Sequence, residues 1–462
     1  TRVSLMDWLS IIPPLLALVI VFWKKEVISA LFIALLSSEF LLILKSNTSH
    51  SLTTPIAAIE RIVGVAGSGS NTRILIFSLL VGALLALIRD SGGVAATVNM
   101  LLQKGVAKNK RQVGAVTMFT GTAVFIESNL SILTSGILAR GLFDKFNMSR
   151  ARLAYIIDST CAPVCILILL NGWGAYVLGL ISAYELTESP VSVLWGSALL
   201  NFYAIFTLLI VAYTIFTDKL HGPMKHEEAI RETISSELKT VTATKARFML
   251  VPLATMIISM FGFMWWTGDG VLTQGSGSKS VLYATLLACF VVYVLLVKHR
   301  QMSHQTTIST AFKGMGELLP LVTIVLLSIA LGASLKLLGT GVFVANLVGA
   351  FLPIFLIVPM LFIAGGIMSF TTGTSWGTFA ILIPIGIPLA QTLGIPPSLV
   401  LAAILGGGVF GDHCSPISDT TAVASLAAGC DLLTHVKTQL PYALVAGGLS
   451  VVAFTVAGLA MT

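Results

Sequence analysis

The chain has 462 residues, of which 56% are hydrophobic and only 10% are charged, and its formal net charge is +7. A soluble domain carries about 25% charged residues because its surface faces water, so this composition excludes an ordinary soluble protein. It predicts an all-α, polytopic membrane protein whose surface faces the lipid bilayer. The sequence has no Lys- and Arg-rich run interleaved with aromatic residues, and binding to nucleic acid is therefore not expected.

Apolar segments of roughly 17–25 residues, the length that crosses a bilayer, recur along the chain. They lie near residues 5–22, 27–44, 73–88, 112–139, 153–182, 190–216, 248–266, 280–297, 318–338, 352–390, 397–430 and 440–461. Residues 217–247 carry mixed charge and predict a polar cytoplasmic linker with a short amphipathic helix. This linker separates a first membrane half, residues 1–216, from a second half, residues 248–462.

The two halves resemble each other in three short motifs that keep the same order. The motifs near Gly82, Thr122 and Asp158 recur near Gly332, Thr374 and Asp412, at offsets of 250, 252 and 254 residues. A nearly constant offset over three motifs favours a duplicated unit over a chance match.

Charged loops orient the two halves, because Lys and Arg collect on the cytoplasmic side of a membrane. Basic residues flank both ends of segment 112–139, so this segment is predicted to enter and leave by one face as a re-entrant hairpin. By the same rule, His435 and Lys437 are expected in a cytoplasmic region. Span 73–88 then runs inward and its counterpart 318–338 runs outward. Two inverted repeats are therefore predicted, each with a hairpin followed by a broken helix, as in secondary transporters.

Residues 411–421 are the most informative stretch, because they place two aspartates, several hydroxyls and a proline between apolar runs. A carboxylate at the centre of a bilayer costs about 2.5–3.5 kcal/mol on insertion scales and needs a partner such as a bound cation. Pro416 breaks the helix and frees backbone carbonyls. The predicted Na⁺/H⁺ site consists of Asp412, Ser415, Ser418, Asp419 and Thr420, together with Asp158 from the first half. The alternative is that the aspartates cap the two half-helices.

Candidate substrate-binding or gating residues lie at the hairpin tips and on the broken helices. Glycines there let the backbone turn and approach a ligand, and small hydroxyl residues offer oxygen ligands. The set comprises Thr122, Glu127, Ser128, Asn129, Thr160, Gly373, Thr374, Ser375, Trp376 and His413. For the tips, the alternative is that these polar groups satisfy the backbone of the broken helices. His413 is a candidate proton carrier, although no carboxylate at a suitable spacing supports that role.

No motif favours an enzyme. Residues 373–377 fit the G-x-S-x-G pattern, but they lie among apolar helical segments instead of in a strand–turn–helix. The five cysteines lie in apolar segments without metal-type spacing and are expected to be reduced.

The stretches 411–425, 372–379 and 439–442 resemble the NhaC family of sodium/proton antiporters, and the repeat organisation extends the resemblance over nearly the whole chain. The resemblance implies membership of the ion transporter superfamily. Its members form homodimers in which a transport domain, built from the hairpins and broken helices, moves as an elevator against a scaffold domain. The family also includes proteins that exchange small organic acids with coupling to sodium and protons.

These features predict a secondary transporter of the bacterial cytoplasmic (inner) membrane that exchanges Na⁺ for H⁺ by alternating access. Competition between Na⁺ and H⁺ for the same carboxylates would couple the two fluxes. The main alternative is a Na⁺-coupled transporter or exchanger of a small organic solute, such as a carboxylate or an amino acid. A passive channel is a further alternative, and its flux would not depend on a counter-gradient.

Overall fold

The computed structural model of the protein describes residues 5–24, 26–46, 51–103, 108–123, 125, 128–169, 171–230, 242–271, 275–416 and 418–461. Within these residues all regular secondary structure is helical, and no strand is present. The predicted all-α fold is therefore confirmed.

The helices follow one another with short connections. The first half contains α1 (Leu5–Leu9), α2 (Ile12–Lys24), α3 (Val27–Lys45), a 3₁₀ turn (Ser51–Thr53), α4 (Thr54–Ala66), α5 (Gly69–Asp90), α6 (Gly93–Gln103), α7 (Lys110–Ala123), α8 (Ser128–Lys145), α9 (Arg150–Leu167), α10 (Gly172–Ile181), α11 (Pro190–Leu199) and α12 (Phe202–Thr217). The linker carries α13 (Gly222–Ile230). The second half contains α14 (Arg247–Thr267), α15 (Gly277–Lys298), α16 (His304–Leu338), α17 (Thr340–Phe351), α18 (Ile354–Thr372), α19 (Ser375–Leu393), α20 (Pro397–Cys414), α21 (Asp419–Ala428) and α22 (Leu432–Leu459).

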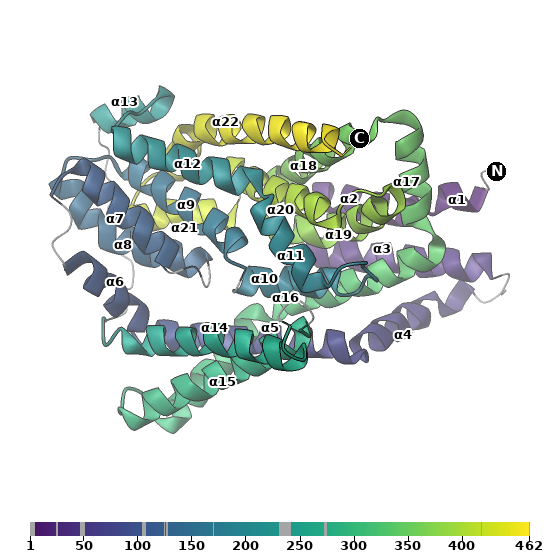
Figure 1. Cartoon of the computed structure of the whole chain (residues 1–462), viewed down its shortest axis with the longest axis horizontal. Coiled ribbons are helices and arrows are strands. Elements are labelled where there is room, and N and C mark those ends of the chain that lie inside the picture. The colour runs from purple at the N-terminus through teal and green to yellow at the C-terminus, as the bar shows by residue number, and fades with distance from the viewer. Residues whose placement is uncertain are drawn as a thin grey trace.

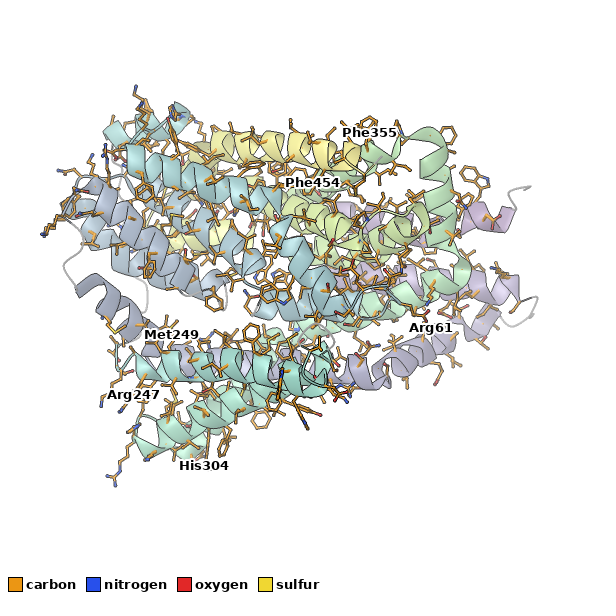
Figure 2. All side chains as sticks on the ribbon, viewed as in Figure 1. Arg61, Arg247, Met249, His304, Phe355 and Phe454 are labelled. Atoms are coloured by element: carbon orange, nitrogen blue, oxygen red, sulfur yellow. The ribbon has the colours of Figure 1, made fainter. Side chains whose placement is uncertain are left out.

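Most of these helices lie side by side along the longest dimension of the molecule, with α14 and α15 along one edge and α12 and α22 along the opposite edge (Figure 1). Within the described residues, ten helical segments are long and apolar enough to cross a bilayer. The chain is therefore an integral membrane protein. Arg247 and His304, at the starts of α14 and α16, lie at the same end of the molecule (Figure 2), as the charge pattern predicts for two cytoplasmic ends.

Four of the apolar segments are divided by a turn, at the places where the sequence predicts hairpins and broken helices. Segment 153–182 divides into α9 and α10, where Asn171 caps the second helix by accepting hydrogen bonds from Trp173 N and Gly174 N. Segments 112–139, 352–390 and 397–430 divide in the same way into α7 and α8, α18 and α19, and α20 and α21. Polar, glycine or proline residues at each break favour a cap or a turn over a continuing helix.

Helix boundaries refine the correspondence between the halves. Helices α8, α9 and α10 begin 247 residues before α19, α20 and α21, respectively. This recurrence supports a duplicated unit, and the inverted orientation of the two units stays a prediction. The boundaries also correct the motif alignment, because Asp412 corresponds to Cys165 and Asp158 to Leu405. Asp158 therefore lies about two helical turns earlier in its helix than Asp412 does.

Glycines bring the helices around residues 411–421 close together. A Cβ atom at Gly411 of α20 would lie 2.7 Å from the Phe370 backbone nitrogen of α18, and one at Gly407 would meet the backbone of Phe362. At the far end of α18, Gly458 of α22 lies against the backbone of Phe355 (Figure 2). These contacts hold α20 between α18 and α22, and α22 also contacts α9 of the first half.

The predicted amphipathic helix of the linker is α13, and it packs on the bundle. Met224 of α13 is fully buried, and Glu228 lies 3.4 Å from the guanidinium of Arg152, which is only 1% exposed. Asp218 also pairs with Arg152, at 2.8 Å. This part of the linker is therefore attached to α9 by two ion pairs.

Candidate functional site

Asp412 lies in the last turn of α20, immediately before the break that Pro416 imposes. Its side chain is 1% exposed. The Ser418 hydroxyl donates a hydrogen bond to Asp412 Oδ1, and the Ser375 hydroxyl donates to Oδ2 at 3.0 Å. Thr420 extends the cluster, because its hydroxyl lies 2.9 Å from that of Ser418. We call Asp412, Ser375, Ser418 and Thr420 the Asp412 cluster.

The second hairpin reaches this cluster through its tip. Gly373 ends α18 with a φ of 71°, a left-handed conformation that glycine adopts without strain. Thr374 then caps α19, and the next residue, Ser375, contacts Asp412. Ser415 ties the same hairpin to the helix break, because its hydroxyl donates to the Phe370 carbonyl at 2.7 Å. The structure therefore brings Ser375 of the hairpin tip together with Asp412, Ser418 and Thr420 of the broken helix.

Two helices begin at the Asp412 cluster, namely α19 after Thr374 and α21 after Ser418. The caps are these two hydroxyl residues, so the half-helix α21 is capped by Ser418 and not by an aspartate. The unpaired amide groups and the dipole of a helix N-terminus favour negative charge. They help to hold the Asp412 carboxylate in a dry site. The side chain of Asp419 lies outside the described residues.

The chemistry of the Asp412 cluster suits a hard monovalent cation. Each hydroxyl that donates to Asp412 keeps lone pairs that can face a cation, and carboxylate and hydroxyl oxygens are hard ligands. Within the described residues, no group of three or more His, Cys, Asp or Glu side chains is placed to hold a metal ion. A tightly bound transition metal has no ligand set among those residues, whereas Na⁺ needs only such oxygens.

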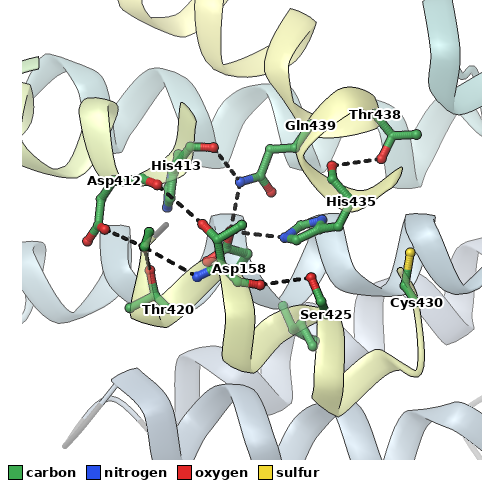
Figure 3. Close-up of polar contacts among 12 residues, drawn as sticks. Asp158, Asp412, His413, Thr420, Ser425, Cys430, His435, Thr438 and Gln439 are labelled. Atoms are coloured by element: carbon green, nitrogen blue, oxygen red, sulfur yellow. Dashed lines mark hydrogen bonds and ion pairs between the residues drawn. The ribbon is translucent and has the colours of Figure 1, made fainter. Parts of the chain in front are cut away.

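Asp158 occupies a second buried cluster, built from nitrogen donors (Figure 3). Its Oδ2 atom lies 3.2 Å from His435 Nε2 and accepts a hydrogen bond from Gln439 Nε2 at 2.7 Å. Both partners come from α22, and all three side chains are fully buried. Gln439 Nε2 also donates to the backbone carbonyl of His413 at 3.0 Å. The Asp158 cluster thus contacts α20 at His413, the residue that follows Asp412.

His413 points away from the hydroxyl groups of the Asp412 cluster and toward α12. Its Nδ1 atom lies 3.0 Å from the hydroxyl of Tyr203, and the side chain is 1% exposed. No described hydrogen bond joins its ring to a carboxylate. The structure therefore places His413 beside the site, and its described hydrogen bond to Tyr203 gives no support to the predicted role as a proton carrier.

The predicted site threonines of the first hairpin and of α9 make hydrogen bonds within their own helices. The hydroxyl of Thr122 donates to Met118 O and that of Thr160 to Ile156 O, each within its own helix. Gly121 lies against the Thr160 side chain, and Ser128 is buried at the start of α8. These hydroxyl bonds match the alternative in which the polar groups satisfy helix backbone. Glu127 and the side chain of Asn129 lie outside the described residues.

Aromatic residues join the two halves near the second hairpin. The rings of Trp173 and Trp376 are 4.9 Å apart, and the Tyr176 ring lies 4.7 Å from that of Trp376. The Tyr176 hydroxyl donates to the Trp376 carbonyl at 2.7 Å. Trp376 thus packs into an aromatic contact between α10 and α19, directly after Ser375.

Two residues of the Asp158 cluster are not among the sequence-predicted site residues. The charge pattern marks His435 only as a residue of a cytoplasmic region, and its side chain is fully buried against Asp158. Gln439 falls in a motif that carries the family resemblance but has no predicted role. The spacing of polar residues in this part of the sequence could have identified them. His435, Gln439 and Tyr442 recur at i, i+4 and i+7, which places three polar groups on one face of an apolar helix.

Comparisons with known proteins agree with this architecture. The sequence model of the Na⁺/H⁺ antiporter family matches residues 164–459. The chain is 30% identical over 481 aligned residues to an uncharacterized protein of Haemophilus influenzae, covering 98% of this chain and 92% of that protein. It is 45% identical to the malate-2H⁺/Na⁺-lactate antiporter of Bacillus subtilis over 92 residues, 20% of each chain. The crystal structure of the YdaH transporter of Alcanivorax borkumensis has a similar fold, with a TM-score of 0.62 at 14% identity over 89% of each chain.

Proposed function

This chain belongs to the Na⁺/H⁺ antiporter family, and we propose that it exchanges Na⁺ for H⁺ across the bacterial cytoplasmic membrane. Because members of this family are transporters, the protein is a secondary antiporter and not an enzyme. The finer assignment, that Na⁺ and H⁺ are the two exchanged ions, is the proposal.

One observation carries the proposal: a fully buried carboxylate, Asp412, lies among hydroxyl groups at the meeting point of a hairpin tip and a helix break. An uncompensated carboxylate at membrane depth is costly. Either a proton or a sodium ion removes the negative charge, and the two compete for the same oxygens. The neutralised site can cross between the two faces of the membrane, whereas the bare anion cannot, and this difference couples the two fluxes.

Asp158 has a different role in this proposal. Its described partners, His435 and Gln439, present nitrogen atoms to the carboxylate, and N–H groups cannot coordinate Na⁺. We assign the Na⁺ ligands to the Asp412 cluster, with Ser415 holding the hairpin in place. Asp158 then serves as a second proton-binding carboxylate, contributed by the first half, beside the competition at Asp412.

The resemblance to elevator-type transporters supports two further parts of the proposal. The hairpins α7–α8 and α18–α19, with the broken helices α9–α10 and α20–α21, would move together as a transport domain. A scaffold formed by the remaining long helices would hold a homodimer. Alternating exposure of the Asp412 cluster then follows from movement of the whole domain.

The test is a transport assay with the purified protein in liposomes that contain a pH-sensitive dye. Gradients of Na⁺, Li⁺ or K⁺ are imposed at several pH values, and the thermal stability of the protein is measured with the same salts. We expect a Na⁺ gradient alone to drive proton movement in the opposite direction, and Na⁺ to raise the melting temperature. Proton movement that is equal with Na⁺ and K⁺ would contradict the proposal.

The same assay decides between Na⁺/H⁺ exchange and the organic-solute alternative. The printed name of the Bacillus subtilis relative pairs Na⁺ and H⁺ with malate and lactate, so these two acids are included in the assay. If Na⁺ moves protons only when such an acid is present, the protein is a Na⁺-coupled carrier of organic anions, and the proposal of simple cation exchange is wrong.

A further inference from the structure

The Gln439 side chain links Asp158 to the backbone of His413, the residue that follows Asp412. It comes from α22, contacts Asp158 of α9 and reaches the last turn of α20 that bears Asp412. The side chain is fully buried. Neither the proposed ion ligands nor the family resemblance assigns it a role.

The hydrogen bonds of Gln439 use the geometry of its amide group. The amide nitrogen carries two hydrogens and can serve two acceptors at once. One bond goes to Asp158 Oδ2 at 2.7 Å, and the other goes to the His413 carbonyl at 3.0 Å. No other uncharged side-chain group except that of Asn offers two hydrogens on one nitrogen, and Asn is one methylene shorter.

The His413 carbonyl needs this partner because α20 ends at Cys414. The last four carbonyls of a helix have no amide partner within the helix. Asp412 O accepts hydrogen bonds from Ser415 N and Thr421 Oγ1, both at 3.2 Å, whereas His413 O accepts from Gln439. The Gln439 amide therefore contributes one of the hydrogen bonds that hold the turn bearing Asp412.

Three polar atoms around Gln439 have no hydrogen-bond partner in the described structure, and all three are buried: Asp158 Oδ1, His435 Nδ1 and Gln439 Oε1. A buried polar atom without a partner costs about 1–3 kcal/mol, so these three atoms can each take a further hydrogen bond. The two bonds of the Gln439 amide nitrogen are the observation that links Asp158 to α20.

We propose that Gln439, held against Asp158 beside His435, is the positioning residue that couples the Asp412 cluster to Asp158. Occupation of the Asp412 cluster changes the position of the last turn of α20, and the Gln439 amide transmits this change to the Asp158 carboxylate. This inference rests on the Na⁺/H⁺ exchange proposed above.

The test replaces Gln439 with methionine, which has a similar length and flexibility but no hydrogen-bond donor. The matched control is Thr438→Val on the same helix. Thr438 is also buried, but its hydroxyl donates only to Thr434 O and His435 O within α22. Radioactive Na⁺ uptake and proton release are measured together in liposomes, so that the number of protons moved per Na⁺ is obtained for each variant.

We expect Gln439→Met to transport Na⁺ while the protons moved per Na⁺ fall about fivefold, the lower end of usual coupling between two sites. The Thr438→Val control should keep the wild-type ratio. An unchanged number of protons per Na⁺, whether or not both fluxes become slower, would overturn the inference. A purely structural role would change the rate of transport without changing this number.

A binding measurement keeps the inference testable apart from transport. The apparent Na⁺ affinity is read from thermal stabilisation. Asp158→Asn is expected to change this affinity about fivefold in the wild-type protein. In a protein that already carries Gln439→Met, Asp158→Asn should leave it unchanged. If Gln439→Met does not purify as a folded protein, Gln439→Asn, which is too short to span both acceptors, takes its place.

An Asp158→Asn effect of equal size in both backgrounds refutes the inference. A wild-type protein that Na⁺ neither stabilises nor drives refutes the proposed function itself, and the inference with it.

Discussion

The Asp412 and Asp158 clusters contain the same kind of carboxylate, equally buried, in different surroundings. Hydroxyl groups of Ser375 and Ser418 face Asp412, whereas nitrogen atoms of His435 and Gln439 face Asp158. A hydroxyl can donate to a carboxylate in one state and turn its lone pairs toward a cation in another. An amide N–H or imidazole N–H can only donate. The comparison teaches that two equally buried aspartates can differ in the partners around them, and we propose that these partners decide which cation each aspartate serves.

The largest expected effect follows from removing each carboxylate in turn. We expect Asp412→Asn to weaken Na⁺ binding about 100-fold or more, because a close ion–carboxylate contact in a partly dry site is worth about 4 kcal/mol. Na⁺-dependent thermal stabilisation measures this directly. Asp158→Asn should keep Na⁺ binding measurable while proton movement is lost. If Asp158→Asn removes Na⁺ binding as completely as Asp412→Asn does, the distinction between the clusters is wrong.

A smaller effect is expected from changing the packing that supports only the Asp412 cluster. In Gly411→Ala the new Cβ atom would meet the backbones of Gly366 and Phe370, so α18 and α20 must move apart. Overpacking of this kind costs about 1–3 kcal/mol, and we expect a lower melting temperature together with weaker Na⁺ binding.

The control for this change is Gly448→Ala on α22, where a Cβ atom meets nothing within 4 Å. Alanine is about 1 kcal/mol better than glycine within a helix, so this variant should be neutral or slightly more stable. A Gly411→Ala protein with wild-type stability and Na⁺ affinity would show that the close approach of the two helices is not needed.

Removing a single hydroxyl sharpens the comparison further. Ser375→Ala deletes one hydrogen bond to Asp412. Its loss is expected to weaken apparent Na⁺ affinity about fivefold to tenfold, equivalent to about 1–1.4 kcal/mol. The assay is the Na⁺ concentration that gives half-maximal proton movement. Ser259→Ala, which removes a hydroxyl bonded within α14, should leave this concentration unchanged, and an equal shift in both variants would refute a specific role for Ser375.

The smallest effect is expected for a charge remote from both clusters. The Lys336 ammonium lies 3.5 Å from Glu185, and their side chains are 57% and 94% exposed. Exposed ion pairs contribute about 0–1 kcal/mol, so Lys336→Gln should change neither the melting temperature nor the ratio of protons to Na⁺. A changed ratio in liposomes would mean that coupling extends beyond the two clusters.

Much of the Asp412 cluster follows from the sequence, because its members are close together along the chain or belong to a recognisable turn. Asp412, Ser415, Ser418 and Thr420 fall within nine residues around Pro416, and a proline between polar residues in an apolar run predicts a break there. Gly373 beside Thr374 likewise predicts the hairpin tip. The contact between Ser375 and Asp412 was foreseeable as soon as a hairpin and a broken helix were expected to meet.

The Asp158 cluster could not be derived in the same way. His435 and Gln439 are 277 and 281 residues from Asp158, and their own neighbourhood resembles the polar start of a membrane helix. The motif match also paired Asp158 with Asp412, whereas the helix boundaries place the two residues at different depths in their helices. The sequence pattern around His435 and Gln439 carries no information about which distant helix will pack against these side chains.

The sequence by itself determined the membrane setting, the order of the main apolar segments, and the position of the second helix break. It did so because hydropathy, proline and glycine act on the backbone locally. Only the tertiary structure decided which donors face each buried aspartate, since packing of α9, α20 and α22 brings residues from both halves together. The physical reason is that a buried carboxylate takes its chemistry from the hydrogen-bond partners within reach, and that set is fixed by packing, not by position along the chain.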